Sequence, residues 1–170
     1  MDNRAKLYLG IGIVIVFLVA VITFVNFRPQ SAESAYQTPA PEEVVRQYFE
    51  SWDKKNWPDM YATISDGFKK IDPDAKDLQS FIEFAESQNV SGVKINSIEI
   101  ESMQMDGIEV SKDLAGMPRM TAVIKYSVEF LLKDGTFKNF SDRFTLKFRD
   151  GDIIPGWKLV HPYGKNIDTT

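Results

Sequence analysis

Hydrophobic and polar side chains alternate along the second half of the chain with a period of two residues. From Ala122 to Leu132 every second side chain is aliphatic or aromatic, and polar residues such as Lys125 and Glu129 stand between them. This alternation predicts a β-strand that buries one face. Asp134-Gly135 follows and predicts a tight hairpin with a type I′ turn, which requires positive φ at both central residues.

Two further segments continue this pattern toward the C-terminus. In the run from Phe137 to Phe148, aromatic and aliphatic side chains again alternate with polar ones. Asp150-Gly151 predicts the next turn, and Trp157, Leu159 and His161 then share one face of a short final strand. The C-terminal half is therefore expected to form an antiparallel meander with one apolar face, which other elements must cover.

Helical periodicity precedes these strands. Three segments have apolar residues spaced three or four positions apart, which predicts amphipathic helices. They are Glu42–Lys55, a shorter helix that starts at Pro58 and ends at Asp66-Gly67, and Asp77–Gln88. Residues 68–76, around Asp72-Pro73-Asp74, are expected to form a polar loop. The aromatic side chains on the helical stripes are expected to lie in the core.

A change of period marks the start of the sheet. Val93 and Ile95 share one phase and Ile98 the other, which predicts a bulge near Asn96-Ser97 and hence a bent strand. A weaker strand with its own turn is expected at residues 105–110, followed by an exposed loop at 112–118. The expected fold class is α+β, with three helices packed on a curved antiparallel sheet.

The N-terminal segment Leu7–Phe27 contains 21 residues and no charge. At about 1.5 Å per residue such a helix spans roughly 30 Å, the thickness of a bilayer core. A cleaved signal peptide is the alternative, but its apolar region is normally only about 7–15 residues long. The sequence therefore predicts an N-terminal transmembrane helix that precedes the α+β domain.

Charges flanking this segment predict its orientation. Arg4 and Lys6 precede it and Arg28 alone follows closely, so the positive-inside rule places the N-terminus in the cytoplasm. The expected organisation is a cytoplasmic stub at residues 1–6, an anchor at 7–27, a flexible linker at 28–41, an extracytoplasmic cone-shaped α+β domain at 42–164 and a tail at 165–170. The protein is thus expected at the cell membrane, with its single domain outside.

Composition narrows the classes of function. The chain has no cysteine and one histidine, so neither a thiolate nor a histidine-rich metal site is expected, and no cofactor is predicted. Its formal net charge is −4, and no basic cluster is present, which argues against nucleic-acid binding. Hydrophobic residues make up 44% of the chain, enough for a substantial core.

Two stretches resemble nuclear-transport-factor-2-like (cystatin-like cone) domains. Residues 41–61, Pro-Glu-Glu-Val-Val-Arg-Gln-Tyr-Phe-Glu-Ser-Trp-Asp-Lys-Lys-Asn-Trp-Pro-Asp-Met-Tyr, are similar to the opening helices of that family. Residues 150–162, Asp-Gly-Asp-Ile-Ile-Pro-Gly-Trp-Lys-Leu-Val-His-Pro, are similar to its terminal strand. The resemblance spans about residues 42–162 and implies a cone-shaped α+β fold.

Within that family, the sequence is most similar in character to the non-catalytic N-terminal domain of low-affinity penicillin-binding proteins. Those domains also follow a single membrane anchor. This sequence ends at Thr170 without a transpeptidase domain or an active-site serine motif. The resemblance therefore implies no catalytic residue.

Some relatives with this fold are similar to ketosteroid isomerases, so polar residues on the inward phase of the strands are candidates for chemistry. Tyr126, Asp142 and His161 are in phase with apolar neighbours. A buried group of this kind would serve in acid–base catalysis, because burial and pairing shift such groups toward neutral pH. The simpler interpretation is that Tyr126 packs in the core and a bulge turns Asp142 outward.

Asp72, Asp74 and Asp77 are a second group of polar candidates. Their spacing lacks the glycine and the terminal glutamate of an EF-hand loop. A solvated loop that caps the next helix is the favoured interpretation, and no metal site is predicted.

The expected function is a non-enzymatic interaction or accessory module at the cell envelope that acts on a protein or wall component. A small-molecule-binding or isomerase-like protein is an alternative, as is a structural subunit of an envelope-spanning secretion or conjugation complex. The sequence leaves the partner and the oligomeric state open.

Overall fold

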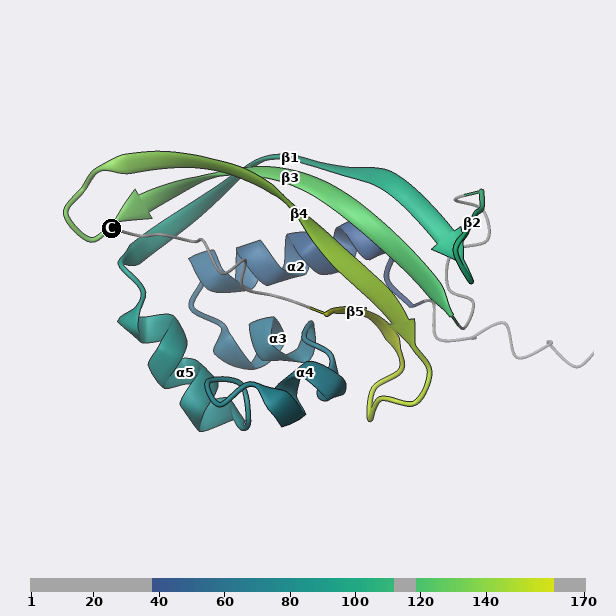
Figure 1. The fold of residues 1–170 in the computed structure, drawn as a ribbon. Helices are drawn as coiled ribbons and strands as arrows, with labels where there is room; N and C mark the ends of the chain where they lie inside the picture. The colour runs from purple at the N-terminus through teal and green to yellow at the C-terminus, as the bar shows by residue number, and fades with distance from the viewer. Residues whose placement is uncertain (1–37, 112–118, 161–170) are drawn as a thin grey trace, which may run out of the picture. The chain divides into compact units, whose positions relative to one another are not determined.

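A computed structural model describes residues 38–111 and 119–160, which form one α+β unit (Figure 1). Its helices are α2 (Pro41–Asp53), α3 (Trp57–Ala62), α4 (Asp66–Ile71) and α5 (Leu78–Ser87). Its strands are β1 (Val90–Met105), β2 (Ile108–Glu109), β3 (Met120–Leu132), β4 (Phe137–Arg149) and β5 (Gly156–Leu159). The α+β class that the sequence predicts is therefore present.

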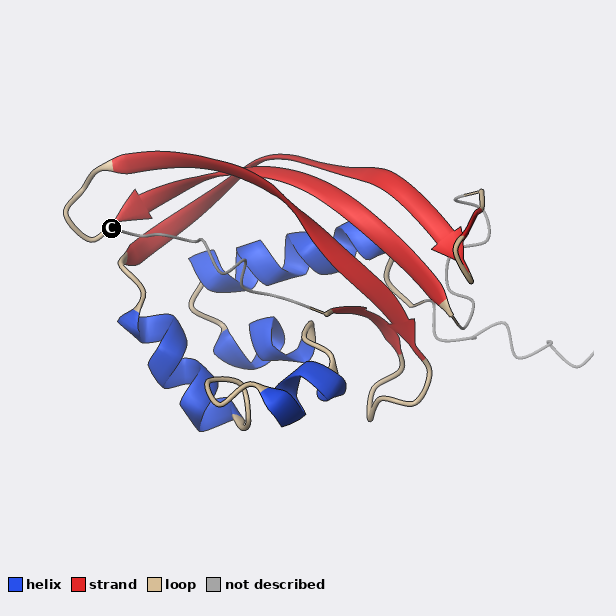
Figure 2. Ribbon diagram, in the orientation of Figure 1, coloured by secondary structure: helices blue, strands red, loops and turns tan. Residues whose placement is uncertain are grey.

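The described strands form one antiparallel sheet in the order β2-β1-β3-β4-β5. Register shifts interrupt the β1–β3 pairing at three places, one of them between Ile95 and Ser97. This shift confirms the bulge that the change of phase predicts. Bulges bend a strand, and Figure 2 shows the long strands curving over the helices, which all lie on one side of the sheet.

Helix α2 follows the rules for an amphipathic helix. Pro41 occupies its first turn, and the Glu43 carboxylate accepts a hydrogen bond from the Ala40 N–H at 3.1 Å. The predicted apolar stripe is buried, with Val45, Tyr48 and Phe49 almost fully enclosed. The helix lies under the sheet, and its buried face covers the apolar face of the meander (Figure 1).

Strand β3 provides the centre of the core. All its inward residues from Met120 to Phe130 are buried, in the period-2 pattern that the sequence predicts. Rings from α2 meet rings from β3 and β4: the Phe49 and Tyr126 ring centroids lie 4.9 Å apart, and those of Tyr126 and Phe144 lie 4.5 Å apart. Packed aromatic rings therefore fill the space between helix and sheet at this level.

The predicted fold class is wrong in its helices. The described residues contain four helices instead of three, and none of the four can cross a membrane, since the longest has 13 residues where about 20 apolar ones are needed. The segment Leu7–Phe27, on which the prediction of a transmembrane helix falls, lies outside the described residues.

The additional helix is α4, at residues expected to form a helix end and a loop. The helix predicted to run from Pro58 to Gly67 ends at Ala62 instead, because Ile64 pairs with β5. Ser65 then caps α4, its Oγ accepting a hydrogen bond from the Phe68 N–H at 3.2 Å.

The hairpin at Asp134-Gly135 forms, but its turn is not of type I′. Only Gly135 has positive φ, at 86°. The Gly135 N–H donates to the Leu132 carbonyl at 3.0 Å, and the Leu132 N–H donates to the Thr136 carbonyl at 2.8 Å. This is a three-residue loop, a turn followed by a left-handed glycine, which closes a hairpin as readily.

Candidate functional site

The structure brings two of the three predicted acid–base residues together. Tyr126 on β3 lies directly opposite Asp142 on β4 in the strand register. The Tyr126 side chain is only 1% exposed, whereas Asp142 is exposed, and one of its carboxylate oxygens accepts a hydrogen bond from the Arg143 N–H at 2.8 Å. His161 lies outside the described residues. The proposed catalytic role of this group stays a prediction.

Burial governs the chemistry of Tyr126. Desolvation raises the pKa of its phenol well above the ordinary value, and the nearby Asp142 charge raises it further. The ring stacks against Phe144 and packs against Phe49. Tyr126 therefore remains protonated at neutral pH and serves the core through its ring.

The acidic group around Pro73 makes local backbone contacts. Asp72 accepts a hydrogen bond from the Asp74 N–H at 2.9 Å, and Asp77 caps α5 by accepting from the Ser80 N–H at 2.8 Å. Within residues 38–111 and 119–160, no three acidic or histidine side chains are arranged to hold a metal. The capping interpretation of Asp77 is confirmed.

A different part of the molecule gathers polar groups from distant segments. We call it the α4–hairpin corner: α3, α4 with the residues up to Lys76, and the β4–β5 hairpin at residues 149–158. The connection between α3 and α4 holds these parts together, because Ile64 pairs with Leu159 in parallel fashion. The Ser65 N–H donates to the Leu159 carbonyl at 3.0 Å, and the Leu159 N–H donates to the Thr63 carbonyl at 2.9 Å.

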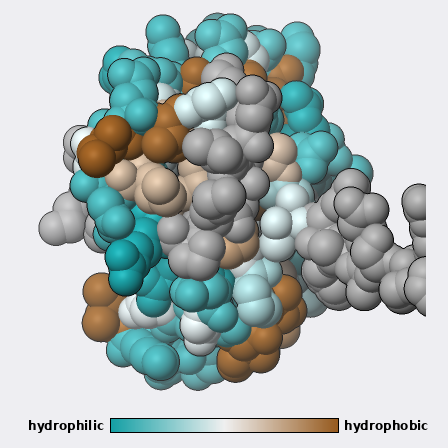
Figure 3. All heavy atoms as spheres, turned by 90° about the vertical axis from the view of Figure 1, so that its right-hand side faces the viewer, coloured by the Kyte–Doolittle hydropathy of each residue, from teal (hydrophilic) through white to brown (hydrophobic). Residues whose placement is uncertain are grey.

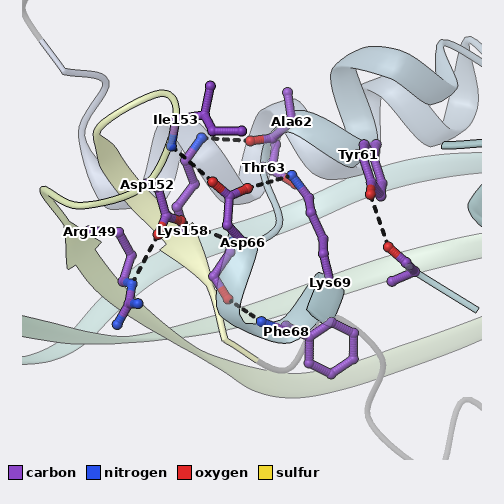
Figure 4. Close-up of polar contacts among 12 residues, drawn as sticks. Tyr61, Ala62, Thr63, Asp66, Phe68, Lys69, Arg149, Asp152, Ile153 and Lys158 are labelled. Atoms are coloured by element: carbon purple, nitrogen blue, oxygen red, sulfur yellow. Dashed lines mark hydrogen bonds and ion pairs between the residues drawn. The ribbon is translucent and has the colours of Figure 1, made fainter. Parts of the chain in front are cut away.

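Two aspartates join α4 to the hairpin in a reciprocal arrangement (Figure 4). The Asp66 N–H donates to the Asp152 carboxylate at 3.0 Å, and the Ile153 N–H donates to the Asp66 carboxylate at 2.9 Å. Asp152 is buried and also accepts from Arg149 Nε at 3.3 Å. The bond from Ile153 is the main reason why the pKa of Asp66 lies below its usual value, and partial burial opposes it.

Lys69 and Tyr61 stand beside this pair of aspartates. Lys69 Nζ lies 3.3 Å from the Asp66 carboxylate and 4.2 Å from the centre of the Tyr61 ring. The Tyr61 hydroxyl donates to the Ala75 carbonyl at 2.9 Å. Burial raises the pKa of Tyr61, and the charges of Asp77 and Asp66 add to the effect. The cation thus contacts both a carboxylate and an aromatic face.

Lys158 on β5 is a partly buried cation at the other side of the corner. Its Nζ donates to the Ala62 carbonyl at 2.6 Å. Burial lowers the pKa of this amine, and repulsion from Lys69 lowers it further, while Asp152 and Asp66 partly offset both effects. Lys158 is therefore an ammonium group held where its charge is poorly solvated.

Two hollows open at the corner. The larger, about 590 Å³, is bordered by four cationic side chains, Lys69, Lys70, Lys76 and Arg149, and by two carboxylates, Asp66 and Asp152. The smaller, about 230 Å³, lies between α3 and the hairpin. Positive charge is thus in excess at this corner, although the whole chain has a net charge of −4.

Apolar side chains protrude next to these hollows. Ile153 is 91% exposed and Ile154 is 55% exposed, and both border the smaller hollow. On the face drawn in Figure 3, hydrophobic residues reach the surface in separate patches among hydrophilic ones. The two isoleucines thus leave apolar area beside the hollow available for contact with another molecule.

Sequence reasoning missed this corner. The sequence pattern predicts a loop at residues 68–76 and only a turn at Asp150-Gly151. A signal was present, since Ser65 and Asp66 begin a helix and Lys69 and Lys70 end one. The contact between α4 and the hairpin, 86 residues apart, has no signature in the sequence.

No protein-family model and no curated protein matches this chain. Among solved structures, a crystal structure of a SEC-C motif containing protein from Psychrobacter arcticus aligns with a TM-score of 0.45 and 11% sequence identity. The alignment covers 79% of this chain and 68% of that chain. A similarity at this level assigns neither a family nor a function.

Proposed function

We propose that this protein is a non-enzymatic interaction module of the cell envelope. Its domain is of the nuclear-transport-factor-2-like kind, and it binds a protein or wall component through the α4–hairpin corner. The observation that carries this proposal is the combination of two protruding isoleucines with a hollow in which cationic side chains outnumber carboxylates. The partner it fits carries an acidic segment next to apolar groups.

The architecture of the corner supports binding rather than catalysis. Asp66 and Asp152 each accept hydrogen bonds from the backbone, so their carboxylates hold α4 and the hairpin in place. Lys70 and Lys76 are exposed and remain accessible to a partner. A frame held by hydrogen bonds, with exposed cations at its rim, attracts and orients an acidic partner.

The sequence of the N-terminal segment supports the location. Leu7–Phe27 carries no charge, and we place the contact with the membrane there, with the N-terminus in the cytoplasm. In the described domain Thr38 lies beside the hairpin: its methyl carbon is 3.4 Å from the position that a Cβ on Gly156 would take. Thr38, the first described residue, is therefore close to the hairpin of the corner.

Site-specific crosslinking in the native membrane tests this proposal. A photoreactive amino acid replaces Ile153 in the full-length protein, and a matched control replaces Ile108, which is also exposed but lies on β2. We expect a discrete crosslinked product from position 153 and none from position 108. Lys70→Glu should weaken that product, whereas Lys147→Glu on the sheet should leave it unchanged.

Equal yields of crosslinked product from positions 153 and 108 would contradict the proposal, because they would show that the partner does not bind preferentially at the α4–hairpin corner. Unchanged capture after Lys70→Glu would contradict the role of charge. Protease accessibility of the domain in intact cells tests the location separately, and protection of the domain from added protease would overturn it.

A further inference from the structure

The smaller hollow of the α4–hairpin corner is bordered by apolar side chains on two sides. Pro58, Tyr61 and Ala62 of α3 form one side, and Ile153 and Ile154 of the hairpin border the other. Its volume of about 230 Å³ is below the roughly 300–1,000 Å³ of pockets for drug-sized ligands. The hollow therefore fits a small group with an apolar part.

Polar groups in this hollow favour an anion. Lys158, Lys69 and Asp66 are the charged side chains at its wall, an excess of one positive charge. Asp66 is already engaged, since its carboxylate accepts from the Ile153 N–H at 2.9 Å and lies 3.3 Å from Lys69 Nζ. Asp152 and Asp66 offset the charge of Lys158 only in part, so an anion in the hollow would be attracted to it.

The Lys158 ammonium group has more hydrogen-bond donors than its described contacts use. An ammonium group has three donors, and the described contacts of Lys158 Nζ comprise one hydrogen bond, to the Ala62 carbonyl. The group is partly buried and lies close enough to Lys69 for the two charges to repel. A carboxylate in the hollow would accept the free donors and relieve this repulsion.

We propose that this hollow binds a carboxylate attached to a small apolar group, with Lys158 as its principal ligand. The carboxylate lies against Lys158 and Lys69, and the apolar group contacts Pro58, Tyr61 and Ile154. Two sources carry this chemistry, the C-terminal residue of a partner chain and a free short-chain carboxylic acid. The first source rests on the proposed function, and the second is independent of it.

Calorimetric titration of the full chain in mild detergent tests this inference. The probes are N-acetyl-Ala-Val with a free carboxylate, the same dipeptide as its C-terminal amide, and pentanoate. We expect the free acid to bind and the amide to bind at least tenfold more weakly. A dipeptide that binds more tightly than pentanoate identifies a chain terminus as the source, and the reverse order identifies a free acid.

The matched variants are Lys158→Met and Lys147→Met. Lys147 on β4 lies opposite Lys158 in the strand register but is exposed, so it controls for the loss of one charge from this pair of strands. Lys158→Met should weaken binding of the free acid by about tenfold to a hundredfold, the range for one hydrogen bond to a charged group. Lys147→Met should leave it unchanged.

A measurement on the unaltered protein covers the case in which Lys158→Met does not fold. Lysine Nζ resonances followed by NMR should show the pKa of Lys158 rising when the free acid is added, because the carboxylate stabilises the ammonium form. Equal binding of acid and amide, or an unchanged Lys158 pKa at saturation, would overturn the inference. Binding of the free acid without any crosslinked partner would refute only the proposed function.

Discussion

The aromatic core and the α4–hairpin corner hold the same domain together by different means. In the core, α2 packs on β3 and β4 through rings such as Phe49, Tyr126 and Phe144. In the corner, α4 is held to the hairpin by carboxylates that accept backbone hydrogen bonds, as Asp66 and Asp152 do. Burial of apolar area dominates the first region, and directed polar contacts dominate the second.

This difference matters for function. A core closed by packed rings leaves little room for a ligand, and its residues cannot change without loss of stability. The corner keeps cations, two hollows and two isoleucines at the surface while its frame stays fixed. The region built from polar contacts is therefore the one free to bind a partner.

Truncation of a core ring should have the largest effect on stability. Phe49 is almost fully buried and packs against Tyr48, Tyr126 and Phe144. Phe49→Ala should lower the free energy of unfolding by about 3–5 kcal/mol, the range for loss of a buried aromatic ring. Denaturant unfolding measures it, and a loss below about 1 kcal/mol would show that the core is not closely packed here.

Removal of the buried carboxylate in the corner should have a smaller effect. Asp152→Ala leaves the Asp66 N–H and Arg149 without their partner, so the free energy of unfolding should fall by about 1–3 kcal/mol. Asp150→Ala is the matched control, because Asp150 is exposed in the same hairpin. Similar losses for both variants would argue that the reciprocal bonds do not stabilise the corner.

Acid should weaken the corner through Asp66. Its folded-state pKa is lowered, so its contribution to stability is fully present above the unfolded value of about 3.9 and is lost as the pH falls through the folded value. Asp66→Asn should therefore flatten the pH dependence of unfolding below about pH 4. The exposed Asp74→Asn serves as a control, and an unchanged slope in Asp66→Asn would contradict the role of the Ile153 contact.

The smallest effect on the free energy of unfolding is expected for a substitution at Asp142, at the rim of the core. Asp142 is exposed and opposite Tyr126, so Asp142→Asn should change the free energy of unfolding by no more than about 0.5 kcal/mol. A larger loss would place Asp142 in the packing of the core. If the variant also leaves ligand binding unchanged, the acid–base hypothesis for Tyr126, Asp142 and His161 is to be abandoned.

Sequence patterns predict the core well because each of its elements has its own local pattern of apolar and polar residues. The apolar stripe of α2 and the alternation of β3 are local, and the buried residues follow both patterns. The bulge between Ile95 and Ser97 also left a local signal, the change of phase. The turn at Gly135 differs in type from the predicted type I′ turn, since Asp-Gly fits more than one hairpin geometry.

The corner was not predictable in the same way. The connection around Ile64 is extended because Ile64 pairs with Leu159. The residues near Ile64 show no sequence pattern that predicts pairing with a residue 95 positions away. Lys158 is a polar residue in a strand pattern, and its partial burial depends on where α3 lies. Contacts between distant segments have no period, so pattern analysis does not detect them.

The sequence alone determined the class of this domain, because the periods of 3.6 and 2 residues decide which faces must be buried and hence that helices cover one side of a meander. Only the tertiary structure decided which polar residues meet. Asp66, Asp152 and Lys158 acquire their hydrogen bonds from neighbours that folding brings within about 3 Å. The pKa values of Asp66 and Lys158 are lowered by the same folded surroundings. Electrostatic and hydrogen-bonding energies depend on distance, and distance between remote segments is set by the fold.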